Sequence, residues 1–254
     1  MIETSTTEIF IGIMVLIRAG ALLMFIPPLG GEAVPKRVRI LLAALLALMV
    51  LPVVARPDEV PAHTLGLVIV GGKEVVVGLF MGLAVRMVLY AVDYAGRVMA
   101  HESSLMMSMS FDPLSNSQTS TISSLLFYFT VIFMMILGVH HAVLLAFVRS
   151  YDIIGIGMQM PGPQGMQEMI HASTEVFSLG VRMAGPLIAL NFVINLSMAI
   201  LGKVAPKINV FMTSFAVRIM ASLWLLAGSS MLVAQYIYNA SMDAPDMMLR
   251  FLLP

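Results

Sequence analysis

Long apolar runs divide the sequence into six segments, each close to or above the length of a membrane-spanning helix. A helix rises 1.5 Å per residue, so about 20 mostly apolar residues cross the hydrocarbon core of a bilayer. Proline, glycine and aspartate mark turns between most of the runs. The pattern predicts an all-α membrane protein whose long hydrophobic helical segments are arranged as hairpins, at roughly residues 8–26, 38–55, 65–95, 121–149, 174–200 and 209–238.

The third and fourth segments are longer than a bilayer requires. Three explanations remain open: tilted helices, helices that extend beyond the lipid, and a break, which in the third segment would fall at Gly71 and Gly72. In the same segment, Gly78 and Gly82 are four residues apart, a spacing that permits close approach of another helix. Pro186 is a further position at which a helix is expected to bend or break.

Composition supports the membrane assignment. Hydrophobic residues make up 59% of the chain and charged residues 11%, and the mean hydropathy is +0.96, outside the range of soluble globular domains. Basic and acidic residues balance at 14 each, so the chain lacks the polybasic surface that nucleic-acid binding requires. The absence of cysteine excludes disulfides and thiolate metal sites.

Lysine and arginine outside the apolar segments favour one side of the membrane. No basic residue precedes Arg18, so the first segment lacks the positive start of a secretory signal and is expected to be retained. The positive-inside rule places the odd-numbered connections in the cytoplasm and both termini on the other side. The bases counted are Lys36, Arg37, Arg39, Arg97, Lys203 and Lys207 in the odd connections, against Arg56, Arg149 and Arg250 elsewhere.

Charged residues interrupt the apolar segments. Each costs about 2.5–3.5 kcal/mol at the centre of a membrane helix, so these side chains are expected to face protein or water. For any one pair, mutual satisfaction inside the helix bundle is the favoured explanation. For the whole set, contact with partner subunits or a hydrated conduit is favoured, because six helices have little interior. The candidate inter-subunit polar contacts are Arg18, Lys73, Glu74, Arg86, Asp93, Glu175, Arg182 and Arg218.

Helical spacing places several polar residues on shared faces. These sets are Arg86, Tyr90, Asp93 and Arg97 in the third segment, and Glu175 with Arg182 and Asn191 with Asn195 in the fifth.

A methionine cluster adjoins a stretch that is too polar to span a membrane, after the third segment. Methionine is apolar and adaptable, so it often serves only to fill a core. The alternative is a soft rim beside a polar loop, suited to a seal that closes and then conforms to varied polypeptides. The candidate gating or plug loop comprises Met106, Met107, Met109, Phe111, Asp112, Pro113, Leu114, Ser115 and Asn116.

Catalytic and nucleotide-binding motifs are missing from the sequence: it contains no phosphate-binding loop, zinc-protease motif or nucleophile elbow. His140 and His141 are adjacent, as are His101 and Glu102, and neighbours in sequence are expected to point to different helix faces. We therefore expect no metal, no cofactor and no enzymatic activity.

Several short motifs follow one another along the chain: Val34-Pro35-Lys36-Arg37-Val38-Arg39 after Pro27-Pro28, then Asp112-Pro113, then Gly138-Val139-His140-His141 followed by Leu144-Leu145-Ala146-Phe147 and Ser150, and finally Gly185-Pro186-Leu187-Ile188 leading into Ala205-Pro206-Lys207-Ile208-Asn209-Val210-Phe211. From about residue 10 to 220, their order and spacing resemble those of the flagellar biosynthetic protein FliR family. This chain departs from the family at residues 101–107, where members usually carry a Gln-Met-Gly-like stretch.

The resemblance implies a single integral-membrane export-gate domain over residues 1–254. One copy would assemble with several FliP-like and FliQ-like subunits into a helical gate in the bacterial inner membrane, at the centre of the flagellar basal body. FlhA-like and FlhB-like components would lie beside it, and unfolded flagellar proteins would pass through it. The family gate is raised largely out of the bilayer plane, which accounts for overlong, charged helices. The resemblance also implies that the loop after the third segment plugs the channel.

Three alternatives remain. The related subunit of virulence injectisomes is similar in the same regions, although the short tail after residue 238 favours the flagellar protein. A small-solute secondary transporter would use Lys73-Glu74 or Arg86-Asp93 as a coupling site, but residues 1–120 and 121–254 show no convincing repeat. An intramembrane hydrolase would need a nucleophile and a base at matching depth, and none is evident.

Overall fold

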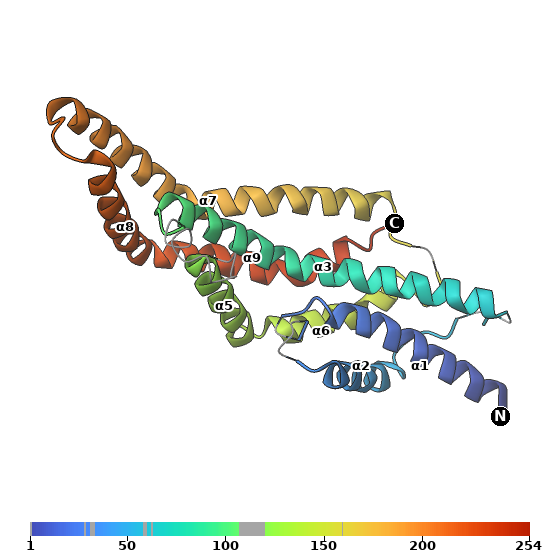
Figure 1. The fold of residues 1–254 in the computed structure, drawn as a ribbon. Coiled ribbons are helices and arrows are strands. Elements are labelled where there is room, and N and C mark those ends of the chain that lie inside the picture. Colours follow the sequence, from blue (N-terminus) through green and yellow to red (C-terminus); the bar gives the residue numbers. More distant parts are fainter. Residues whose placement is uncertain are drawn as a thin grey trace. The chain divides into compact units, whose positions relative to one another are not determined.

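A computed structural model describes residues 2–27, 29–30, 34–57, 60–61, 63–106, 120–158 and 160–254. Within these ranges the chain forms eight helices and no strand, which confirms the predicted all-α class (Figure 1). The helices are α1 (Ile2–Leu23), α2 (Lys36–Val50), α3 (Thr64–Glu102), α5 (Thr121–Ile136), α6 (Val139–Ile153), α7 (Pro163–Val204), α8 (Val210–Gly228) and α9 (Ser230–Arg250).

Three described helices are long and apolar enough to cross a membrane: α3, α7 and α8. The bent pair of α5 and α6 makes a fourth if it is counted as one span. Six spans are therefore not confirmed. The α2 helix has 15 residues and is about 22 Å long, less than the bilayer core of about 30 Å. The predicted segment 209–238 divides at Ser229 into α8 and α9.

The helix breaks do not fall at the predicted glycines or at the internal proline. The α3 helix runs through Gly71 and Gly72 for 39 residues, and α7 runs through Pro186 for 42. The fourth segment breaks instead at Gly138, whose φ of +71° is a conformation that glycine adopts without the steric penalty of a Cβ atom. The α3 and α7 helices are each about 60 Å long, twice the thickness of the bilayer core.

The chain divides into two compact units. Unit 1 comprises Met1–Val88, Met134–Ser173 and Ser241–Pro254, and unit 2 comprises Leu89–Phe133 and Thr174–Ala240. The boundary falls within α3, α5, α7 and α9. The expectation of one domain over residues 1–254 stays a prediction.

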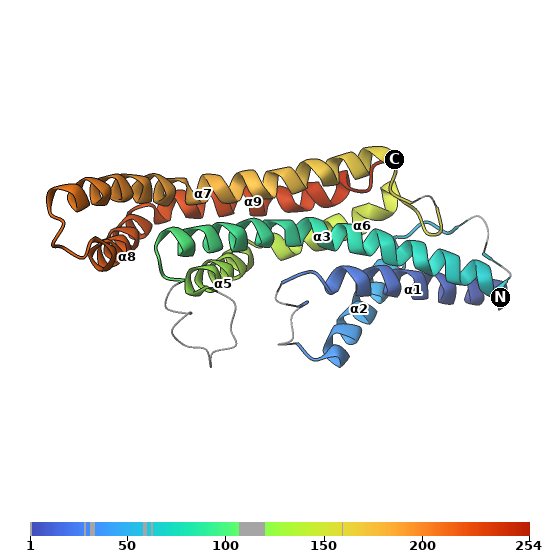
Figure 2. The same cartoon turned by 45° about the horizontal axis from the view of Figure 1, so that its top comes forward.

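In unit 1, α1 packs closely along the first part of α3, and the two lie side by side in both views (Figure 1, Figure 2). A Cβ atom on Gly78 would lie 2.5 Å from the carbonyl oxygen of Arg18, and one on Gly82 would lie 2.7 Å from Cβ of Phe25. No real Cβ atom fits at such distances, so glycine is what allows the helices to approach. The predicted close approach is confirmed.

Unit 2 has its own apolar core, built from four helices. The α3 helix again approaches through a glycine, because a Cβ on Gly96 would lie 2.5 Å from Cα of Ser123. The rings of Tyr94 and Phe177 meet edge to face with centres 5.4 Å apart. The core residues are Val92, Ala95, Met99 and Ala100 of α3, Ile122 and Leu126 of α5, Met183, Ala184 and Leu187 of α7, and Val233 and Ile237 of α9.

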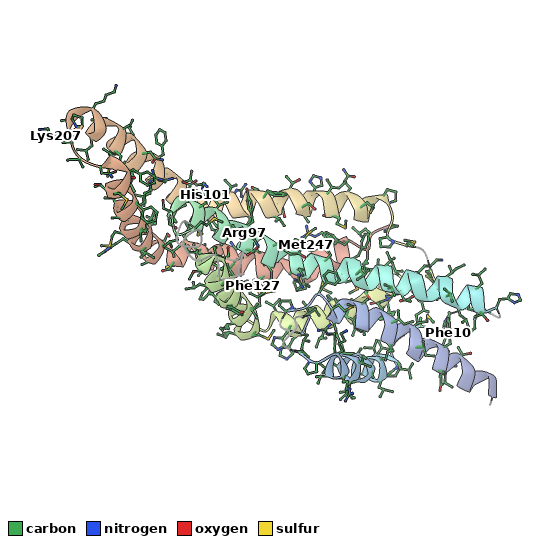
Figure 3. The ribbon with its side chains drawn as sticks, in the orientation of Figure 1. Phe10, Arg97, His101, Phe127, Lys207 and Met247 are labelled. Carbon is green, nitrogen blue, oxygen red and sulfur yellow. The ribbon has the colours of Figure 1, made fainter. Side chains whose placement is uncertain are left out.

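The end of α7 and the α8 helix in unit 2 are largely uncovered. Within the apolar window of each helix, only 11% of the residues are buried. Lys207 lies in the short connection between the two helices (Figure 3). An apolar surface of this extent requires lipid or another protein to cover it. Its large exposed residues include Phe192, Val193, Leu196, Ile200 and Val204 of α7, and Phe211, Met212, Met220, Leu223 and Trp224 of α8.

Candidate functional site

Arg18 is the centre of a buried polar cluster in unit 1, where its side chain is completely shielded from solvent. Its Nε donates to Oε2 of Glu74 at 2.6 Å, and its Nη1 donates to Oγ of Ser150 at 3.1 Å. Both terminal nitrogens donate to the carbonyl oxygen of Ile154 at 3.1 Å. The guanidinium carbon lies 4.0 Å from the centre of the Tyr151 ring, a cation–π contact. One side chain thus joins α1, α3 and α6.

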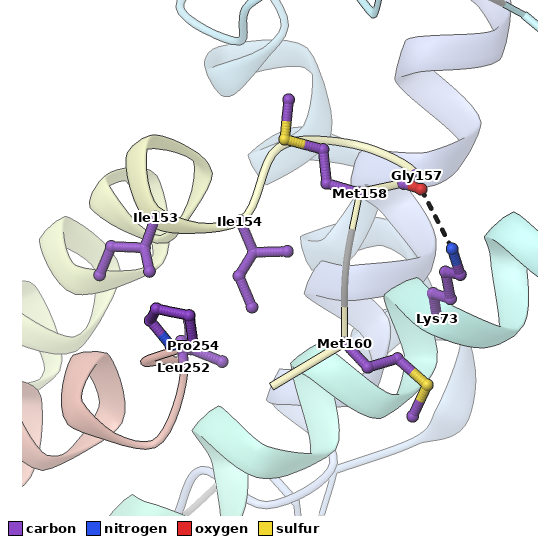
Figure 4. Close-up of a pocket in the computed structure, with 8 residues that line it drawn as sticks. All are labelled: Lys73, Ile153, Ile154, Gly157, Met158, Met160, Leu252 and Pro254. Carbon is purple, nitrogen blue, oxygen red and sulfur yellow. Dashed lines mark hydrogen bonds between the residues drawn. The ribbon is translucent and has the colours of Figure 1, made fainter. Parts of the chain in front are cut away.

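Two adjacent residues of α3 hold both backbone polar groups of Gly157. The Gly157 N–H donates to Oε1 of Glu74 at 3.2 Å, and Nζ of Lys73 donates to the Gly157 carbonyl oxygen at 3.3 Å (Figure 4). Gly157 has a φ of +75°, which favours glycine. Because the charges of Arg18 and Glu74 compensate each other, burial does not leave an isolated ion. Arg18 and Glu74 thus satisfy each other within the chain, which is the explanation favoured above for any single pair.

A cavity of about 430 Å³ lies beside this cluster in unit 1 (Figure 4). Its walls are mainly aliphatic and thioether side chains, and Lys73 is the charged side chain among them. These lining residues include no nucleophile paired with a base. The lining residues are Lys73, Ile153, Ile154, Gly157, Met158, Met160, Leu252 and Pro254.

The predicted polar face of the third segment carries an ion pair in unit 2. Nε of Arg97 donates to Oδ2 of Asp93 at 2.9 Å, one helical turn away. Arg97 and His101 follow each other along this part of α3 (Figure 3). Oγ of Ser123 donates to the Asp93 carbonyl oxygen at 3.2 Å, which ties α5 to the same turn.

The two asparagines predicted to share a face of α7 each bind a different helix in unit 2. The Asn191 amide donates to Glu102 of α3, and Asn195 accepts from Nη2 of Arg218 of α8. Oδ1 of Asn191 and Nε of Arg218 are both buried, and neither has a hydrogen-bond partner within the described part of the chain. Unit 2 therefore contains polar groups that its own described residues do not fully satisfy.

The other predicted contact residues have varied environments. Arg86 is partly buried on α3, whereas Glu175 and Arg182 are exposed on α7. Arg18 and Glu74 bond to each other within the chain, and contact of the other six candidate residues with neighbouring subunits stays a prediction. Of the candidate plug loop, Met106 is described and is exposed just after α3. The other candidates lie outside the described residues: Met107, Met109, Phe111, Asp112, Pro113, Leu114, Ser115 and Asn116.

The paired histidines differ from expectation. The rings of His140 and His141 lie with centres 4.0 Å apart, so the prediction that they point apart was wrong. Among the described residues, no group of three histidine, cysteine, aspartate or glutamate side chains is arranged to hold a metal ion.

Sequence reasoning missed the partners of Arg18. An arginine within an apolar segment signals that a partner is needed, but its contacts lie 56, 132 and 136 residues away along the chain. Ser150 was noted only as part of a motif, and Gly157 carried no signal beyond being a glycine near a turn.

The sequence of this chain is similar to those of a known family and of several known proteins. Residues 9–244 match the family described as bacterial export proteins, family 1. The flagellar biosynthetic protein FliR of Caulobacter vibrioides is 27% identical over 223 residues, covering 87% of this chain and 88% of the relative. FliR of Bacillus subtilis is 27% identical over 219 residues, covering 84% and 83%. The Yop proteins translocation protein T of Yersinia pestis is 27% identical over 177 residues, covering 68% and 67%.

The long apolar helices and the relatives together define an all-α integral membrane component of a bacterial export apparatus. The chain belongs to the bacterial export proteins, family 1, and the resemblance to the FliR family is confirmed.

Proposed function

We propose that this protein is a non-enzymatic subunit of a flagellar type III protein-export gate, in the inner membrane at the basal body. In that role it forms part of the channel wall and supplies a plug for the passage of unfolded flagellar proteins. The observation that carries the proposal is the similarity to FliR proteins, which covers 83–88% of both chains for the two FliR relatives described above.

The uncovered surface of α7 and α8 supports a place inside a larger assembly. Only 11% of each apolar window is buried, yet the same helices carry Arg182 and Arg218, which lipid does not readily accept. Neighbouring subunits would cover the apolar residues and also supply polar partners for the two arginines. We assign this cover to FliP-like and FliQ-like subunits, with FlhA-like and FlhB-like components beside them and no role for nucleic acid.

The decisive experiment is co-expression of the tagged chain with FliP-like and FliQ-like proteins from the same genome. The mass of the detergent-purified product is then measured. We expect a large complex that contains one copy of this chain. A stable monomer or homodimer that ignores both candidates contradicts the proposal and favours a secondary transporter, which is expected to be stable alone.

A subunit of a virulence injectisome is the second candidate. It is favoured by the similarity to the Yop proteins translocation protein T, which covers 68% of this chain. Deletion of the gene separates the two functions. Loss of motility with normal effector secretion supports the flagellar gate, and the reverse result supports the injectisome.

A further inference from the structure

We propose that Arg218 in unit 2 is the docking point for a carboxylate on an apolar helix of a neighbouring membrane subunit. This inference rests on the proposed function, since it needs a hetero-oligomer. It adds the chemistry of the partner: an acidic side chain within a segment that is otherwise apolar.

The bonds of Arg218 leave its charge uncompensated. Its Nη2 donates to the side-chain oxygen of Asn195, which is a neutral amide. Its Nε is buried, and no acceptor for it lies within the described residues. A guanidinium carries five N–H donors in a planar fork that matches the two oxygens of a carboxylate. The site therefore lacks a negative acceptor.

Two acidic residues of unit 2 are already engaged elsewhere. Asp93 forms an ion pair with Arg97 on the same helix. Glu102 accepts from Asn191. Neither carboxylate has a recorded contact with Arg218.

The remaining acidic residues of unit 2 are Glu175 and Asp112. Glu175 precedes Asn195 by 20 residues on α7, which is about 30 Å along a helix, too far to reach the guanidinium that Asn195 contacts. Asp112 lies outside the described residues, so the experiment includes it as a rival.

The phosphate groups of lipids are also too far from Arg218 to serve as its acceptor. Arg218 follows the first residue of α8 by 8 positions and precedes the last by 10, which places it about 12 Å and about 15 Å from the helix ends. An arginine side chain does not extend that far, so it cannot reach the interface if α8 spans the bilayer. If α8 spans the bilayer, the acceptor therefore lies at the same depth as Arg218 and is not a lipid phosphate.

The surroundings of Arg218 suit a helix better than a loop. Phe211, Met220 and Trp224 of α8 are 65%, 63% and 80% exposed, and Phe192 and Leu196 of α7 are 69% and 55% exposed. A helix that covers such residues at membrane depth must itself be apolar, because an irregular backbone there leaves polar groups unsatisfied.

The test uses the full chain co-expressed with FliP-like and FliQ-like proteins, and it measures how much of the chain is recovered in the large complex. We expect Arg218→Leu to lower this recovery at least tenfold, and Arg218→Lys, which keeps the charge, to lower it less than threefold. The matched control is Arg97→Leu, which removes an exposed arginine of unit 2 that already has its own carboxylate; we expect less than a threefold change.

A second experiment does not depend on the folding of Arg218→Leu. It starts from cells that carry Arg218→Glu and selects revertants that have regained motility. We expect revertants in which an acidic residue in a membrane segment of another subunit becomes lysine or arginine. Revertants confined to this chain overturn the proposal. So does Asp112→Asn reproducing the loss seen with Arg218→Leu, because the partner is then internal.

Assembly of the wild-type chain separates failure of the proposed function from failure of the carboxylate partner. If the wild-type chain forms no complex with either candidate, the proposed function is wrong. If the wild-type chain assembles and Arg218→Leu assembles equally well, only the carboxylate partner is wrong.

Discussion

Arg18 and Glu74 form an ion pair of 2.6 Å whose side chains are 0% and 2% exposed. The pair joins α1 to α3, and further bonds from Arg18 to Ser150 and the Ile154 carbonyl extend it to α6. Glu74 in turn holds the N–H of Gly157, in the connection that leads to α7. Separate segments of unit 1 thus depend on one buried guanidinium.

Removing one member of this pair is expected to destabilise the protein strongly. Arg18→Met or Glu74→Met leaves the other charge buried without its partner, which costs about 3–5 kcal/mol. The double variant Arg18→Met/Glu74→Met is expected to lose less than the sum of the two single variants, because no buried charge remains. The measurement is the free energy of unfolding by SDS titration in detergent micelles.

The control for this prediction is the exposed pair of Arg56 and Glu8, at 3.3 Å with side chains 64% and 52% exposed. Arg56→Met is expected to change stability by about 1 kcal/mol or less, because solvent screens exposed pairs. Equal effects at both pairs contradict the structural role assigned to Arg18.

Gly157→Ala is expected to cost about 1–2 kcal/mol through its backbone conformation. The φ of +75° disfavours any residue with a Cβ, while the new atom would meet Val70 only at an ordinary 3.5 Å. Gly72→Ala is the matched control, since that position is helical and open and alanine favours a helix over glycine. Thermal midpoints of the detergent-purified protein should fall for the first variant and stay level or rise for the second. A fall of the same size in both indicates that the conformation of Gly157 is not what matters.

Gly96→Ala is expected to disturb the packing of unit 2. The added Cβ would lie 2.5 Å from Cα of Ser123, a backbone atom that cannot move aside as a flexible side chain does, and overpacking of this kind costs about 1–3 kcal/mol. Gly185→Ala adds a methyl group in open space on α7 and serves as the control. Protease resistance of the purified protein distinguishes the two, and an equally resistant Gly96→Ala would contradict the close approach of α3 and α5.

Deletion of residues 108–117 is expected to open the closed gate. The sequence has a methionine-rich stretch beside this polar loop, and the proposed plug would block ions while the gate is closed. Ion conductance of the purified complex in planar bilayers should rise in the deletion variant. Its subunit composition should remain unchanged, which separates a lost plug from failed assembly. Unchanged conductance in an intact complex contradicts the plug.

Several particular features could be predicted from sequence, and they are local ones. The spacing of Gly78 and Gly82 correctly indicated close helix packing, and the spacing of Asn191 and Asn195 predicted a shared polar face, although not the different helices to which the two side chains bond. Both predictions use the 3.6-residue period of the helix, which places residues four apart in the sequence on the same face. The break positions could not be predicted in this way. Gly71 and Gly72 remain helical in α3, whereas Gly138 adopts a positive φ because the chain turns there.

The helical class, the membrane setting and the family could all be predicted from long apolar runs and ordered motifs, because such patterns depend only on neighbouring residues. The sequence also showed that Arg18 and Arg218 need partners, since a charge in an apolar helix is costly wherever the helix lies. The partners themselves could not be predicted: Arg18 pairs with a carboxylate 56 residues away, while the hydrogen bond of Arg218 to a described residue goes to the neutral Asn195. Burial and ion pairing depend on which helices pack together, and that arrangement is set by contacts far apart in the sequence.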